Sequence, residues 1–234
     1  MQVEEFATEA ADTLGDSLVA VYQYGSNFAR GPKAKEAHLL MVVENVEAPL
    51  LKDMRPLAKR AREANYHIRF DTHNDIVCCA DVFPVFVLEL IDTKSLLQGK
   101  DVLADLSVHS DHLRSRVEQN LRVLHRDLLA AFVADEDHKA LALHLRQAVR
   151  RSVYLLRALG IACEIDLPKL PTVEQLIDEV VGKLLPDTNR GIWHRLRRMA
   201  NYEDSVPGDK LDELFGETLK AYSELVDAVD KLEA

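Results

Sequence analysis

The chain has 234 residues, of which 47% are hydrophobic, and a formal net charge of −10. This apolar fraction excludes a disordered chain, and the acidic balance argues against general nucleic-acid binding, which depends on cations that neutralise phosphates. Because no apolar run reaches the roughly 20 residues of a membrane-spanning helix and the N-terminus is acidic, we expect a cytoplasmic protein with no membrane partner.

The three cysteines are Cys78, Cys79 and Cys163. An odd number that includes two neighbours is typical of reduced thiols rather than of a disulfide framework. Neighbouring residues of a strand point to opposite faces, so Cys78 and Cys79 are poor joint metal ligands. Because free cysteines are usually buried, the sequence predicts three buried structural thiols.

The N-terminal half alternates between helical and strand patterns. Helices are predicted where apolar residues recur every three or four positions, and strands where short apolar runs are bounded by glycine, proline or charge. The predicted helices are 3–14, 49–65 and a short one from Thr93 to Gly99. The predicted strands are 18–24, 39–46, 66–70 and 83–91, and the segment 75–80 fits either a strand or the start of a helix.

From about residue 110 onward the pattern is almost entirely helical. The predicted helices are 111–134, 136–159 (ended by Gly160), 172–185, 192–202 and a last one from about 209. Thr172 and Gln175 have the spacing of a capping box. The change of pattern predicts an α+β chain with two domains: residues 1–108 with a small mixed β-sheet, and residues 109–234 as an all-α helical bundle.

A glycine–serine pair, Gly25-Ser26, follows the first predicted strand and precedes a polar loop. A strand that ends in this way can offer backbone N–H groups and a hydroxyl to a phosphate, and Lys33 and Lys35 add positive charge in the loop. An ordinary strand end without a ligand is the alternative. The order of strand, Gly-Ser, loop and strand resembles the nucleotidyltransferase superfamily of the polymerase-β type, which implies a nucleotide-binding mixed sheet.

The same resemblance implies two acidic residues that open the next strand and hold divalent metal for phosphoryl transfer. The aligned positions are Ala37 and Leu39, or Glu36 and His38 if the alignment shifts by one residue. The resemblance further implies a third acidic residue on a neighbouring strand, and Glu89 is the candidate. The alternatives are a solvated Glu36 and an internal ion pair or hydrogen bond for Glu89. We therefore assign no metal ligand, and expect Mg²⁺ only if the protein is an active enzyme.

Residues 83–103 carry a narrower resemblance. Phe83-Pro84, Glu89 and the segment from Leu97 to Leu103 are similar to bacterial nucleotidyltransferase-like proteins of unassigned role. On a mostly apolar helix of the bundle, Arg150 and Arg157 are candidates to line a cleft between the domains and hold an anion. Internal salt bridges are the alternative for both arginines.

Three hypotheses follow from these patterns. The leading one is a degenerate nucleotidyltransferase-like protein that binds a nucleotide, another phosphate-bearing ligand or a protein partner without efficient transfer. The second is an active metal-dependent transferase with an atypical site formed by Glu36, His38 and Glu89. The third is a structural or regulatory homodimer formed through the amphipathic bundle helices, with no nucleotide ligand.

Overall fold

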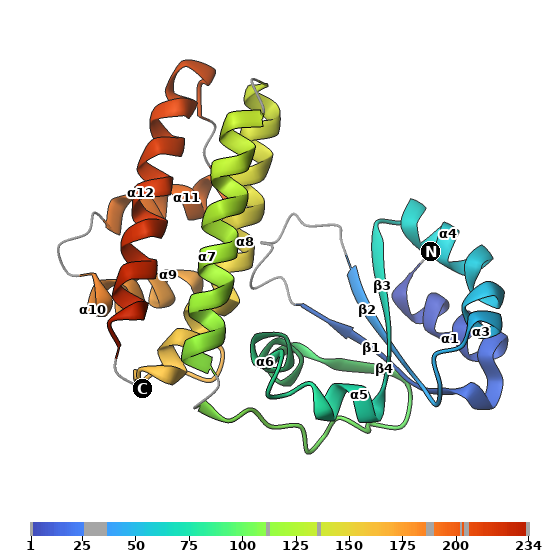
Figure 1. Ribbon diagram of the computed structural model, residues 1–234. Helices are drawn as coiled ribbons and strands as arrows, with labels where there is room; N and C mark the ends of the chain where they lie inside the picture. The colour runs from blue at the N-terminus through green and yellow to red at the C-terminus, as the bar shows by residue number, and fades with distance from the viewer. Residues whose placement is uncertain are drawn as a thin grey trace. The chain divides into compact units, whose positions relative to one another are not determined.

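The computed structural model describes residues 2–25, 37–110, 113–134, 137–185, 190–201, 203 and 206–232. The chain divides into two compact units, the first of which extends to Val108 while the second continues from His109. The first unit contains a four-stranded sheet together with helices, and the second contains helices (Figure 1). The predicted combination of a mixed sheet and many helices is therefore confirmed, whereas the nucleotidyltransferase fold stays a prediction.

The sheet of the first unit has the strand order β3-β2-β1-β4. Its strands are β1 (Leu18–Tyr24), β2 (Ala37–Val43), β3 (Tyr66–Thr72) and β4 (Ser95–Gly99). β1 pairs antiparallel with both β2 and β4, and β2 pairs parallel with β3. The predicted strands at 18–24, 39–46 and 66–70 are confirmed with shifted ends, and the first two are neighbours in the sheet.

Helices cover both faces of this sheet. They are α1 (Val3–Leu14), α3 (Ala48–Asp53), α4 (Arg55–Glu63), α5 (His73–Cys78) and α6 (Pro84–Thr93). Figure 1 shows α1, α3 and α4 on one side of the sheet and α5 and α6 on the other. The predicted helix 3–14 is confirmed, but the predicted helix 49–65 is interrupted by a turn at Met54. Pro56 explains the interruption, since its ring cannot donate a helical hydrogen bond and it stands at the start of α4.

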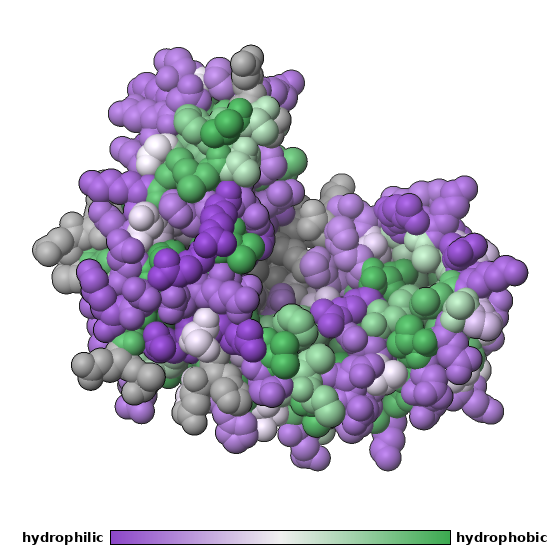
Figure 2. Space-filling model, in the orientation of Figure 1, coloured by the Kyte–Doolittle hydropathy of each residue, from purple (hydrophilic) through white to green (hydrophobic). Residues whose placement is uncertain are grey.

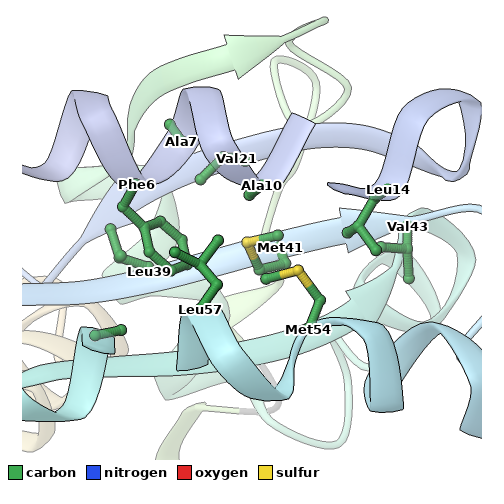
Figure 3. Packing of buried hydrophobic residues seen from close by; sticks show 11 residues of the cluster. Phe6, Ala7, Ala10, Leu14, Val21, Leu39, Met41, Val43, Met54 and Leu57 are labelled. Atoms are coloured by element: carbon green, nitrogen blue, oxygen red, sulfur yellow. The ribbon is translucent and has the colours of Figure 1, made fainter. Parts of the chain in front are cut away.

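Strand alternation divides the buried side chains of the first unit into two cores. Val21, Leu39 and Met41 point to the side of α1 and α4, where they meet Phe6 and Leu57 (Figure 3). The residues between them point to the opposite side: Tyr22, Leu40 and Val42 pack with Ile76 of α5 and Leu90 of α6. Both central strands are thus buried on both faces, which explains their continuous apolar sequence.

Two predicted elements of residues 83–99 are wrong and are exchanged in the structure. The predicted strand 83–91 is helix α6, and the predicted helix from Thr93 to Gly99 contains strand β4. Pro84 occupies the start of α6, and the buried residues Pro84, Val87 and Leu88 follow helical spacing. Gly99 ends a strand rather than a helix: its φ is 85° and an added Cβ would lie 2.9 Å from the Cα of Ala20.

The second unit is built from longer helices. They are α7 (Leu113–Ala134), α8 (His138–Ala162), α9 (Val173–Gln175), a π-helical segment (Leu176–Val181), α10 (Gly182–Leu184), α11 (Arg190–Ala200) and α12 (Leu211–Asp230). α8 packs against α7, α11 and α12. The capping box of Thr172 and Gln175 is present. The prediction that Gly160 ends α8 is wrong, since the helix continues to Ala162. The absence of a side chain at Gly160 leaves room for Leu167, because an added Cβ would lie 2.5 Å from its Cδ1 atom.

Two further observations concern the whole described chain. Cys78 is exposed, and Cys79 and Cys163 are half-buried, so the prediction of three buried thiols is wrong. Cys78 ends α5 rather than standing in a strand, and this position leaves its side chain near solvent. In the parts of the chain that the structure describes, no helix has both the length and the hydropathy needed to cross a membrane.

Candidate functional site

Gly25 lies immediately after β1, and its backbone conformation needs glycine. Its φ of 67° is in the left-handed region, where a side chain is disfavoured. Its N–H donates a hydrogen bond of 2.9 Å to Oγ1 of Thr93, and the hydroxyl of Thr93 donates one of 2.6 Å to the carbonyl oxygen of Glu89. The N–H group of Gly25, which was predicted to bind phosphate, is therefore hydrogen-bonded to the last residue of α6. Phosphate binding by this N–H would require Thr93 to release it.

The two alignments of the acidic pair place residues on opposite faces of β2. Ala37 and Leu39 are buried, and Leu39 belongs to the apolar core beside α1 and α4. His38 points to the other face, because side chains alternate along a strand. Ser26, Lys33, Lys35 and Glu36 lie outside the described residues. Of the two alignments, only the one that includes His38 is compatible with a polar site.

A row of rings crosses three strands at this end of the sheet. Tyr24 on β1 is paired with His38 on β2, and His38 is paired with His67 on β3. The ring centroids of Tyr24 and His38 are 5.5 Å apart, and those of His38 and His67 are 4.9 Å apart. Since β3 lies at the edge of the sheet, His67 is exposed while Tyr24 is buried.

Arg69 and Phe86 extend this row. Arg69 follows His67 by two residues and so lies on the same face of β3. Its Cζ atom lies 4.0 Å from the centroid of the Phe86 ring, which is a cation–π contact, and its Nε forms an ion pair with Asp71. Phe86, on α6, also meets Tyr24 edge-to-face with centroids 5.9 Å apart. We call Tyr24, His38, His67, Arg69 and Phe86 the histidine face.

The histidine face combines aromatic surface with an exposed guanidinium, that of Arg69, which is paired with Asp71 on the same face of β3. Its two exposed members are His67 and Arg69. Exposed rings can stack on a planar group such as a base, and a guanidinium can bind phosphate oxygens in pairs. Sequence reasoning missed both residues, although the alternation in Tyr66-His-Ile-Arg-Phe70 placed them on a single polar face. A planar ligand fits this arrangement if its anionic group replaces or shares Asp71 as the partner of Arg69.

Glu89 does not stand where the resemblance required. It lies on α6 rather than on a strand, so the prediction of a strand carboxylate is wrong. Among the described residues, no three His, Cys, Asp or Glu side chains come together as a metal site would require. The described part of the histidine face therefore offers no acidic cluster for Mg²⁺, which prefers several oxygen ligands.

Tyr22 lies on β1 two residues before Tyr24, on the same face of the sheet, and is bound to a carboxylate. The hydroxyl of Tyr22 donates a hydrogen bond of 2.8 Å to Oδ1 of Asp101 and accepts one of 2.9 Å from the N–H of Val102. Burial and this bond to Asp101 raise the pKa of Tyr22 to about 12. The hydrogen bond from Tyr22, together with Lys94, lowers the pKa of Asp101. These two hydrogen bonds connect Asp101 and Val102, which follow β4, to Tyr22 on β1.

Arg150 and Arg157 both lie on α8 of the second unit. Nη2 of Arg157, a nearly buried side chain, donates a hydrogen bond of 3.0 Å to the carbonyl oxygen of Lys169. This hydrogen bond connects α8 to the loop that follows it, so Arg157, predicted to bind an anion, has a structural role. Arg150 is half-buried on the same helix.

The sequence was also compared with known proteins. No protein-family model matches the chain, and no curated protein matches it.

Proposed function

We propose that the first unit is a nucleotidyltransferase-like domain that binds a nucleotide, or another ligand with a planar group and a phosphate, without efficient transfer. The observation that carries the proposal is the histidine face, where exposed His67 and Arg69 stand beside the rings of His38 and Phe86. The base would stack on the imidazoles, and the phosphate would bind Arg69.

Two features of the sheet support this proposal. β1 and β2, which precede and follow the Gly-Ser loop in the sequence, are neighbours in the sheet, as the resemblance implies, and their pairing is antiparallel. In the alignment without a shift, Ala37 and Leu39 stand at the positions of the expected carboxylates, and both are buried. Apolar side chains cannot supply the oxygen ligands that divalent cations need in phosphoryl transfer. A binding role without transfer is consistent with both features.

Calorimetric titration of ATP, CTP, GTP and UTP with Mg²⁺ tests the binding. We expect at least one nucleotide to bind and His67→Ala to weaken it about 5- to 150-fold, because stacking of one base contributes about 1–3 kcal/mol. Arg69→Ala should also weaken binding by removing the phosphate partner. Arg60→Ala is the control, since Arg60 is an exposed cation of the same unit that pairs with Glu9 on α1.

Two results would contradict the proposal. Unchanged affinity in both His67→Ala and Arg69→Ala would show that any nucleotide binds elsewhere. Transfer of a labelled nucleotide to any acceptor would contradict the absence of efficient transfer, and loss of that transfer in Glu89→Gln would support the alternative site of Glu36, His38 and Glu89.

A further inference from the structure

His38 and His67 form a cross-strand pair on one face of the sheet. β2 and β3 are parallel neighbours, and their register pairs His38 directly with His67. The residues on either side of His67, which are Tyr66 and Ile68, pack against the core that contains Leu39. Because side chains alternate along a strand, both imidazoles leave the opposite face. The backbones of two hydrogen-bonded strands therefore hold the two rings side by side.

The separation of the two rings suits a shared metal ion. Their centroids are 4.9 Å apart and their planes are inclined at 59°, so the rings are tilted rather than stacked face to face. With metal–nitrogen distances of about 2.0–2.1 Å, two imidazoles bound at adjacent positions of one ion have centroids roughly 4.5–5.2 Å apart. The observed separation lies in this range. Binding an ion therefore needs rotation of the two side chains and no movement of the strands.

The surroundings of the pair permit a cation. Tyr24 packs edge-on against the ring of His38, with centroids 5.5 Å apart, and so restricts that ring. His67 is exposed at the edge of the sheet, and hydrophilic residues occupy much of the first unit's surface in the view of Figure 2, so water can complete the coordination. Arg69, two residues beyond His67 on the same face, is ion-paired with Asp71, which offsets its repulsion of a metal ion.

We propose that His38 and His67 together bind a divalent transition-metal ion that accepts imidazole ligands, such as Ni²⁺, Cu²⁺ or Zn²⁺. Each ring supplies one nitrogen, and water occupies the remaining coordination positions. The second nitrogen of each ring keeps its N–H for a hydrogen bond, as is usual for histidine ligands. Mg²⁺ is not the expected ion, because it prefers oxygen ligands. The site does not depend on nucleotide binding, since a metal binds in the plane of a ring whereas a base stacks on its face.

Calorimetric titration of the full chain with Ni²⁺, without nucleotide, measures the site. Ni²⁺ is the suitable probe because Zn²⁺ also binds thiolates, and the chain has three cysteines. We expect His38→Gln and His67→Gln each to weaken Ni²⁺ binding about 100-fold, since the second ligand of a pair binds at a high effective concentration. Glutamine keeps most of the side-chain volume beside Tyr24. His73→Gln is the control: His73 is the exposed first residue of α5, and its variant should bind Ni²⁺ like the wild type.

Proton NMR of the imidazole C–H groups identifies the ligands directly. Ni²⁺ is paramagnetic, so the signals of His38 and His67 should broaden together, at a lower Ni²⁺ concentration than those of the other histidines. Circular dichroism confirms that each variant is folded. A wild type that does not bind Ni²⁺, unchanged affinity in His67→Gln, an equal loss in His73→Gln, or broadening of one ring without the other would each overturn the proposal. Ni²⁺ binding by a chain that binds no nucleotide would support the metal site and contradict only the nucleotide proposal.

Discussion

Replacing Ser152 by alanine should destabilise the helical bundle more than removing the hydroxyl of its partner, Tyr222. Their hydroxyl oxygens are 2.5 Å apart and both residues are buried. The Ser152 hydroxyl donates a hydrogen bond of 2.8 Å to the carbonyl oxygen of Ala148. Its single proton is therefore used, and the Tyr222 hydroxyl must be the donor to Ser152. Burial raises the pKa of Tyr222, so its hydroxyl keeps the proton that it donates.

The two variants differ in what they leave behind. Tyr222→Phe removes one hydrogen bond while Ser152 keeps Ala148 as its acceptor, and this should cost about 1 kcal/mol of unfolding free energy. Ser152→Ala leaves the Tyr222 hydroxyl buried without its acceptor, which should cost about 1–3 kcal/mol. Adding Tyr222→Phe to Ser152→Ala removes that unsatisfied donor. The double variant should therefore be more stable than Ser152→Ala alone.

Urea unfolding followed by tryptophan fluorescence is the appropriate assay. Trp193 is the single tryptophan of the chain, is buried, and has its ring centroid 5.1 Å from that of Tyr222. Its emission therefore reports on the bundle rather than on the sheet of the first unit. A double variant less stable than Ser152→Ala would refute the reasoning, because the second change would then remove a favourable interaction instead of an unsatisfied donor.

Two further predictions concern the first unit. Gly99→Ala should lower the unfolding free energy of the first unit by more than about 1 kcal/mol, because the new Cβ would collide with the backbone of β1. Gly216→Ala in α12 of the second unit is the control: its added Cβ would meet no atom within 4 Å, so it should stabilise by roughly 0.5–1 kcal/mol. Equal effects of the two variants in thermal melts would contradict this prediction. Tyr22 holds its proton more tightly when folded, so the unfolding free energy should fall from about pH 10 up to about pH 12. Tyr22→Phe should make this fall shallower in pH-dependent unfolding, and Tyr66 and Tyr222, whose pKa values burial also raises, account for the remainder.

The parts of the fold that sequence predicted best are those with one dominant period. α1 and the long helices α7, α8 and α12 follow helical spacing over most of their length. The prediction for residues 83–91 is wrong because Glu89 is the single charged residue of this short apolar run, and one polar position does not reveal a period. In such a run Pro84 suits the start of either a strand or a helix. As a helix, this segment covers the second face of the sheet, where Leu90 packs with Tyr22 and Leu40.

The candidate site was harder to predict because it depends on register. The alternation of Tyr66-His-Ile-Arg-Phe70 shows that His67 and Arg69 share a face. It does not show that His67 lies beside His38, which follows from the parallel pairing of β2 with β3. The contact of Phe86 with Arg69 depends on α6 being a helix, and the predicted strand 83–91 does not provide it. The resemblance directed attention to Ala37 and Leu39 instead, and these are buried in the core.

The strand order has a consequence for biosynthesis. β1 takes a neighbour on each side, yet β4 is synthesised about 70 residues after β1. At ribosomal speeds this interval lasts roughly 4–14 s. During that time one side of an apolar strand on the nascent chain has unpaired backbone groups, which can pair with a neighbouring polypeptide. Translation slowed before β4 has left the ribosome should therefore increase aggregation of the newly made protein, and slowing near the end of the second unit should not.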